Sequence, residues 1–158
     1  MRDYEVMHFG QMGDRIDGFG RLLLHVLTKH GEFEPMDDLP CVTISAVGGS
    51  EFMVKAEVHH VPISGTFVHT FAGSRNAPDL YGVLEFKIVD EQGIPTGVPL
   101  LTVAVDAEGN CGWRGRIEDL HTFLPINLEA ARFQRTAILN ALRWKVQELL
   151  VERAKLPE

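Results

Sequence analysis

The sequence NLEAARFQRTAILNALRWKVQELLVERAKL occupies residues Asn127–Leu156 and is free of Gly and Pro. It is rich in strong helix formers, so it predicts one continuous helix at the end of the chain. Asn127 is a suitable N-cap residue for this helix. Glu129 lies in the first turn, where a negative charge favours the positive end of the helix dipole.

This helix has two apolar faces when residues are placed at about 100° each. The wider stripe is expected to face the core. A second row, made of Phe133, Ala137, Trp144 and Val151, lies on the opposite side, because steps of four, seven and seven residues keep one side of a helix aligned. The row is therefore either a seam between two copies of the chain or a second layer of its own core. The core stripe contains Leu128, Ala131, Ile138, Leu139, Leu142, Val146, Leu149 and Leu150.

Length and composition predict one domain that spans residues 1–158, because 158 residues with 45% hydrophobic content can bury a core of their own. The net charge of −7 opposes binding to nucleic acid, whose phosphates need a basic surface. No apolar stretch has the length of a signal peptide or a membrane span, so we expect no membrane contact. Cys41 and Cys111 lie in apolar runs and are expected to be buried free thiols in a reducing cytoplasm.

The N-terminal part predicts a shorter helix. Asp14 or Asp17 opens it, and Gly31 is a typical C-terminal stop. Residues 4–9 alternate weakly between apolar and polar, which indicates a short edge strand or an extended arm. The acidic segment 31–40 is expected to be a loop.

A first hairpin is predicted from two apolar runs, residues 41–47 and 51–61. A three-residue loop at 48–50 pairs Ile44 with Val54 and places every apolar residue on one side. The sheet register of this hairpin follows from that requirement.

Pro62–Gly65 is expected to turn the chain into a third strand, residues 66–71. If His60 pairs with Phe67 across this turn, His60 and His69 become diagonal neighbours on the core face. Two imidazoles within diagonal reach of each other are able to bind a metal or to transfer protons near neutral pH. The alternative is two histidines at the rim of the core, each hydrogen-bonded to backbone. No spacing matches a metal-ligand pattern, so we expect neither a metal nor another cofactor.

Residues 72–79 have the composition of a loop. Arg75 and Asn76, with the small residues before them, are candidates for holding a phosphate or carboxylate. Ordinary turn chemistry explains the same residues.

A three-strand meander follows. Its inner face is apolar if Leu84 pairs with Val103 and Val105 pairs with Cys111. The other face, which includes Thr102, is expected to be wet. The three strands cover residues 80–89, 98–105 and 110–117.

The expected fold is therefore α+β. A single antiparallel sheet of five to six strands, built from the hairpin and the meander, is flanked by the N-terminal helix and the long C-terminal helix on one face.

The sequence contains no catalytic constellation: no Ser lies in a nucleophile elbow, and neither Cys begins a helix. The leading hypothesis is a non-enzymatic protein-binding module, such as an adaptor, a chaperone or an immunity-type protein. It uses its C-terminal helix to form a homodimer or to dock a protein partner. The alternative is a small-molecule-binding sensor or a cofactor-free enzyme, with a pocket near His60 and His69.

Overall fold

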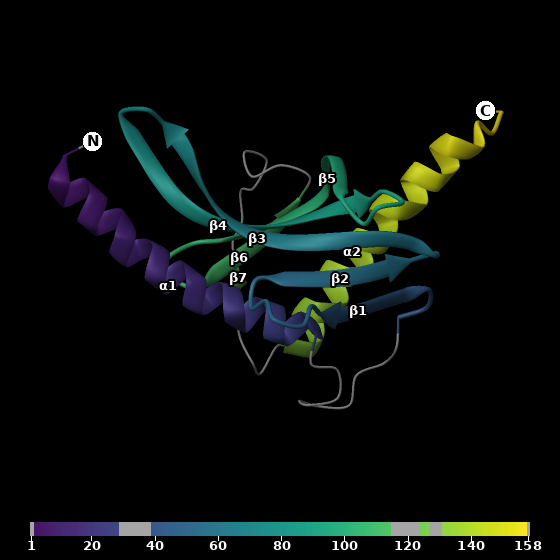
Figure 1. The fold of residues 1–158 in the computed structure, drawn as a ribbon, viewed down its shortest axis with the longest axis horizontal. Coiled ribbons are helices and arrows are strands. Elements are labelled where there is room, and N and C mark those ends of the chain that lie inside the picture. Colours follow the sequence, from purple (N-terminus) through teal and green to yellow (C-terminus); the bar gives the residue numbers. More distant parts are fainter. Residues whose placement is uncertain (1, 29–38, 115–123, 127–130, 158) are drawn as a thin grey trace.

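The computed structural model describes residues 2–28, 39–114, 124–126 and 131–157 (Figure 1). Two long helices accompany one antiparallel sheet, in which each strand pairs with the one before it, and the last strand contributes two residues. The predicted α+β class is thus confirmed. The elements are α1 (Asp3–Thr28), β1 (Val42–Ala46), β2 (Met53–Val58), β3 (Val61–Ser74), β4 (Ala77–Val89), β5 (Pro95–Val105), β6 (Asn110–Arg114), β7 (Leu124–Pro125) and α2 (Ala131–Ala154).

The sheet curls into a half-barrel, and both helices pack on its apolar face (Figure 1). One hydrophobic cluster joins the sheet and the two helices. It includes Ile16 from α1, Phe86 and Val103 from the sheet, and Leu142 from α2, all fully buried. The core therefore lies where the two amphipathic helices and the inner face of the meander meet, as the sequence predicts.

A buried polar contact ties the two helices together. Arg135 of α2 donates a hydrogen bond from Nε to the carbonyl of Leu27, 3.2 Å away, in the last turn of α1. Carbonyls in a last turn have no partner within their own helix, and the negative end of the helix dipole favours a cation. The end of α1 is thus capped by a side chain from the far end of the sequence.

The start of α1 differs from the prediction. The helix begins at Asp3, so the strand or arm expected over residues 4–9 is wrong. These extra turns lie beside the β3–β4 hairpin, where the ring of Phe9 meets that of Phe71 edge-on, with centroids 5.1 Å apart. The N-terminal residues are helical because packing against the β3–β4 hairpin stabilises the extra turns. The predicted stop at Gly31 lies outside the described residues.

Two glycines let α1 approach β3 closely. A β-carbon at Gly20 would come within 2.5 Å of the Phe67 ring, and one at Gly13 would lie 3.0 Å from Cε1 of His69. Glycine lowers the helix propensity of this segment, which is why the sequence favours a later start. Its missing side chain is what allows the helix to pack here.

The register of β1 and β2 is shifted by two residues from the predicted one. Ile44 pairs with Ala56 rather than with Val54, and the loop covers residues 47–52. A shift of two leaves every side chain on its predicted face, because side chains alternate with period two. Phe52 stacks on Phe67, with ring centroids 5.8 Å apart, so the longer loop packs an aromatic side chain over the core.

The connection from β2 to β3 is a two-residue turn at His59 and His60, not the predicted turn at Pro62–Gly65. Val58 pairs with Val61 across it. His59 and His60 have φ values of 49° and 65°, as the tight hairpin turns that match strand twist require. This position usually carries Gly, Asn or Asp, so the turn has no strong signal in the sequence. The expected pairing of His60 with Phe67 is wrong.

Residues 72–79 form the end of a long hairpin rather than a loop. β3 continues to Ser74 and β4 begins at Ala77, so that Arg75 and Asn76 make the turn. The Ser74 hydroxyl accepts a hydrogen bond from the Ala77 N–H at 3.1 Å. This hairpin extends beyond the core, beside the first turns of α1 (Figure 1).

The meander has the predicted register. Leu84 pairs with Val103, and Val105 pairs with Cys111. The carboxylate of Asp106 accepts hydrogen bonds from the N–H groups of Glu108 and Asn110, which closes the turn between β5 and β6.

The outer face of the meander is drier than predicted. Thr102, Val83 and Ala104 are all buried there. The prediction was wrong at Thr102, because alternation assigns a side chain to a face but does not say whether that face is covered.

Candidate docking surface and histidine cleft

The second apolar row of α2 is exposed. Phe133, Trp144 and Val151 have 65%, 63% and 57% of their surface open to solvent, and Ala137 is half-buried. The opposite side of the same helix is buried at Leu142 and its neighbours. The row is therefore not a layer of the chain's own core.

The Trp144 side chain is held in place within α2. Its Nε1–H donates to Oε1 of Glu148 at 2.6 Å. The polar atom of the ring is thus satisfied, and the apolar ring faces outward. A shallow hollow of about 420 Å³ lies beside it, lined by Trp144, Gln147, Glu148, Val151 and Glu152. Aromatic side chains with exposed apolar surface are typical anchors of protein interfaces.

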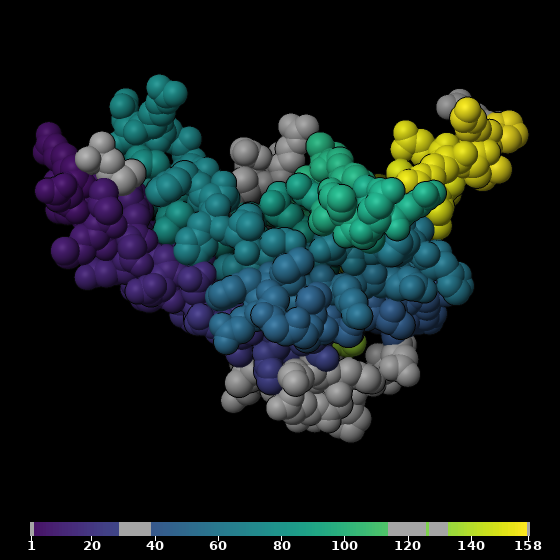
Figure 2. Space-filling view, viewed as in Figure 1, coloured from purple at the N-terminus to yellow at the C-terminus, as the bar shows by residue number. Residues whose placement is uncertain are grey.

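The last turns of α2 leave the body of the protein. Figure 2 shows them as a separate projection, and every residue from 151 to 157 is exposed. Leu156, at the tip, is 65% exposed. The helix therefore presents its apolar row partly on the body and partly on a projecting arm.

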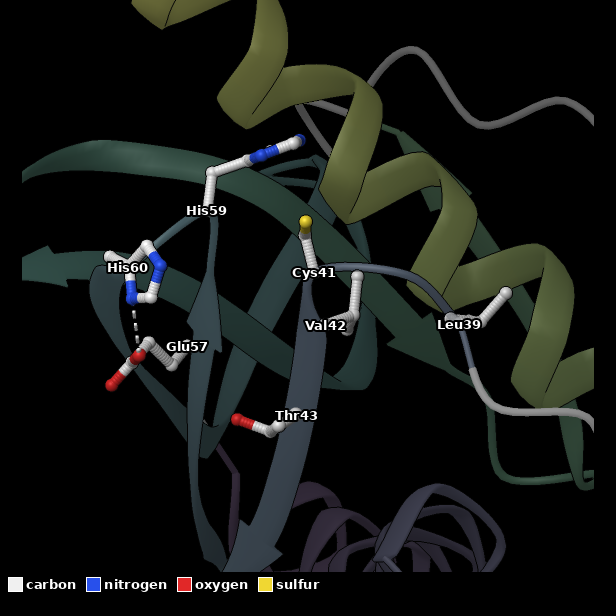
Figure 3. A pocket seen from close by; sticks show the side chains of 7 residues that line it. All are labelled: Leu39, Cys41, Val42, Thr43, Glu57, His59 and His60. Carbon is white, nitrogen blue, oxygen red and sulfur yellow. Dashed lines mark ion pairs between the residues drawn. The ribbon is translucent and has the colours of Figure 1, made fainter.

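A second candidate site is a cleft where β1 begins and β2 turns into β3 (Figure 3). His59 lies next to α2, where the Gln147 amide donates to its Nε2 at 2.9 Å. His60 turns away from α2 and lies 3.5 Å from the Glu57 carboxylate, with 98% of its side chain exposed. The cleft has a volume of about 420 Å³ and is lined by Leu39, Cys41, Val42, Thr43, Glu57, His59 and His60.

Three residues at this cleft have left-handed backbone conformations. The φ values are 62° for Cys41, 49° for His59 and 65° for His60. Non-glycine residues seldom adopt them. The tight turn explains the two histidines, and the His59 N–H donates to the Cys41 carbonyl at 2.9 Å, which joins Cys41 to the turn.

The two cysteines differ in their surroundings. Cys41 is exposed, contrary to the prediction, because it precedes β1 instead of lying within it. Cys111 is buried as predicted. Burial raises the pKa of the Cys111 thiol to about 11, and the nearby Asp106 carboxylate adds to the shift.

His69 lies far from His60, so the predicted pair does not form. The two residues are nine positions apart along an extended chain, about 30 Å at strand spacing. His69 instead faces α1, where its Nε2 lies 2.7 Å from Oδ1 of Asp17. The two histidines therefore do not share one pocket, because the turn between β2 and β3 lies three residues earlier than Pro62–Gly65.

Arg75 and Asn76 are exposed at the tip of the β3–β4 hairpin. The 14 residues of β3 separate them from the His59–His60 turn, about 45 Å of strand. The predicted ligand-binding residues therefore lie at different places and do not converge on one cavity.

Sequence reasoning did not identify Asp17, Cys41, Glu57 or His59 as site residues. The one available signal was the pattern Val-His-His-Val at residues 58–61, in which two polar residues interrupt β-branched ones. Among the described residues, no group of three or more His, Cys, Asp and Glu side chains could hold a metal ion. No helix in the described part of the chain is long and apolar enough to cross a membrane.

No family model, no curated protein and no solved structure matches this chain. The exposed α2 row and the histidine cleft are therefore the two features of the molecule that bear on its function.

Proposed function

We propose that this protein is a non-enzymatic protein-binding module that docks a protein partner on the exposed row of α2. The observation that supports this proposal is the row itself: Phe133, Trp144 and Val151 are more than half exposed on one side of a single helix. Large apolar side chains in such a row are costly to leave in water. A partner that covers them recovers this free energy.

The projecting end of α2 also supports docking. Residues 151–157 are exposed, so the helix extends past its own core. A helix that is unsupported at its end frays in water, since helical stability in proteins comes mostly from packing. A partner along the row stabilises these turns.

The proposal is tested by comparing what three baits retain in cells that express the chain natively: wild type, Trp144→Glu and Val98→Glu. Val98 lies on β5 and is 84% exposed, so its variant introduces the same charge away from the row. We expect wild type and Val98→Glu to retain the same partner protein. Untagged copies of this chain count as a partner in this comparison. Trp144→Glu should retain at least tenfold less of it, as expected for an interface anchor. Equal retention by all three baits would rule out the α2 row as a docking surface.

Small-molecule binding at the histidine cleft is a second candidate function. It is favoured by the cleft itself, which has a volume of about 420 Å³ and is lined by the exposed Cys41 and by His59 and His60. A metabolite library screened by thermal denaturation tests it. A compound that raises the melting temperature of wild type, but not of His59→Ala, would support this function. If the screen finds no such compound, docking is the only candidate that remains.

A further inference from the structure

We propose that the partner on the α2 row is a second copy of this chain, whose α2 packs in parallel against the first as a short two-stranded coiled coil. This inference rests on the docking function proposed above. The α2 seam is defined here by residues that alternate in steps of four and three, which is the heptad spacing of coiled coils. It consists of Phe133, Ala137, Asn140, Trp144, Gln147, Val151 and Ala154, none of which is fully buried.

The order of apolar and polar residues along the α2 seam favours parallel helices. In a parallel pair each seam residue meets its own copy, so Trp144 packs on Trp144 of the partner subunit, and Asn140 meets the amide of Asn140 of the partner subunit. An antiparallel pair that places Phe133 on the partner's Val151 would put Trp144 on the partner's Asn140. That arrangement sets an amide against an apolar ring and leaves its hydrogen bonds unmade. The parallel pair avoids this cost, because each amide faces an amide and each apolar side chain faces an apolar side chain.

Charges beside the α2 seam favour the same orientation. Arg143 and Glu148 flank the seam on opposite sides, five residues apart, and parallel coiled coils pair these two flanking positions between chains. Because the dimer has a two-fold axis, it contains two such ion pairs, each between Arg143 and Glu148 of the partner subunit. Antiparallel helices bring Arg143 toward the partner's Arg143 instead, which is repulsive.

Both charged side chains are already held near the α2 seam. Arg143 donates to Oδ1 of Asn140 at 2.6 Å and to the carbonyl of Pro40 at 3.2 Å. A guanidinium has five N–H donors, so these two contacts leave donors for a carboxylate. Glu148 accepts the Trp144 N–H through Oε1, and its other oxygen lies 3.7 Å from Nζ of Lys145.

The length of the contact sets the expected strength of the dimer. Residues 133–154 span about 32 Å of helix. The Leu142 side of each α2 is buried in its own protomer, and Gln147 at the edge of the seam also contacts His59 of that protomer. Three heptads with two polar layers make a small interface, and we expect a dissociation constant on the order of 10 μM.

The experiment measures this dissociation constant by sedimentation equilibrium of the full chain. Each of the variants Arg143→Glu and Glu148→Arg turns both of these ion pairs into contacts between like charges. Each variant should therefore weaken the dimer at least tenfold. Arg153→Glu on α2 and Glu108→Arg in the turn between β5 and β6 introduce the same charge changes at exposed positions off the seam, and each should weaken the dimer less than threefold. An equal effect of the seam variants and these controls would overturn the proposal.

Circular dichroism shows whether each variant is folded. Glu148 contacts only α2 side chains in the described structure, so Glu148→Arg remains decisive if Arg143→Glu unfolds.

Mixing the variants decides the orientation. An equimolar mixture of Arg143→Glu and Glu148→Arg restores opposite charges in a parallel heterodimer, so the dimer should return to within threefold of wild type. Recovery with a mixture of Arg143→Glu and wild type alone would indicate antiparallel helices and overturn the parallel arrangement.

The outcomes separate this inference from the docking function. A wild-type chain that is monomeric up to millimolar concentration overturns the second copy as partner. The docking function still stands in that case if wild type retains another protein from cells and Trp144→Glu does not. If Trp144→Glu changes neither self-association nor retention, both proposals fail.

Discussion

His69 on β3 and Asp17 on α1 are 52 residues apart in the sequence, yet Nε2 of His69 lies 2.7 Å from Oδ1 of Asp17. The imidazole also lies against the helix backbone at Gly13, where a β-carbon would come within 3.0 Å of the ring. A polar contact and a missing side chain thus fix the position of α1 on the sheet.

Replacing Asp17 with Ala should lower the free energy of unfolding by about 1 kcal/mol, the usual net value of a hydrogen bond in a partly exposed place. Urea denaturation measures this loss. Asp14→Ala is the matched control, because Asp14 lies on the same helix and is exposed; its effect should stay within about 0.5 kcal/mol. Equal losses in the two variants would show that the contact with His69 contributes nothing.

Gly20→Ala and Gly18→Ala should change stability in opposite directions. A β-carbon at Gly18 meets nothing within 4 Å, so alanine there should stabilise the helix by about 0.5–1 kcal/mol. At Gly20 the same atom would lie 2.5 Å from the Phe67 ring, so alanine should destabilise the protein by about 1–3 kcal/mol. Thermal denaturation of both variants checks the signs. A stabilised Gly20→Ala would mean that α1 lies farther from β3.

Stability should fall at alkaline pH because of Cys111. Burial raises the pKa of this thiol from 9.0 to about 11, so the unfolded chain loses the proton first. The contribution is fully present below pH 9.0 and is lost as the pH rises through about 11, amounting to about 2–3 kcal/mol.

Urea denaturation between pH 8 and pH 11, compared with Cys111→Ala, measures this effect of Cys111. The alanine variant is less stable at neutral pH but should lose less stability over this range. Burial also raises the pKa of Tyr81, and this second alkaline effect is common to both proteins. Parallel curves for the two proteins would contradict the assignment to Cys111.

Trp113→Ala tests the register of the meander. Trp113 pairs with Val103 and packs against the core, so its truncation should cost about 3 kcal/mol. Val98→Ala, on the exposed start of β5, should cost less than about 0.5 kcal/mol. Urea midpoints measure both, and a midpoint that hardly moves in Trp113→Ala would contradict the register.

The exposed row of α2 could be located from the sequence because helical periodicity assigns Phe133 and Trp144 to the side opposite Leu142. Periodicity does not say whether another element covers that side, and the structure leaves it open to solvent. The histidine cleft could not be located in the same way. A turn of His59 and His60 lacks the residues that usually mark a tight hairpin, and shifting the turn moved His60 away from His69.

The sequence by itself determined the α+β class, the core stripe of α2 from Ile138 to Val146 and the pairing of Leu84 with Val103, because these follow from side-chain periods of 3.6 and 2 within one segment or between adjacent ones. Only the tertiary structure decided where α1 begins, which glycines it needs and which partner His69 has. Each of these depends on a surface that the long β3–β4 hairpin brings to the helix from about fifty residues away. Local preference in residues 4–20 is weak, and packing against that surface outweighs it.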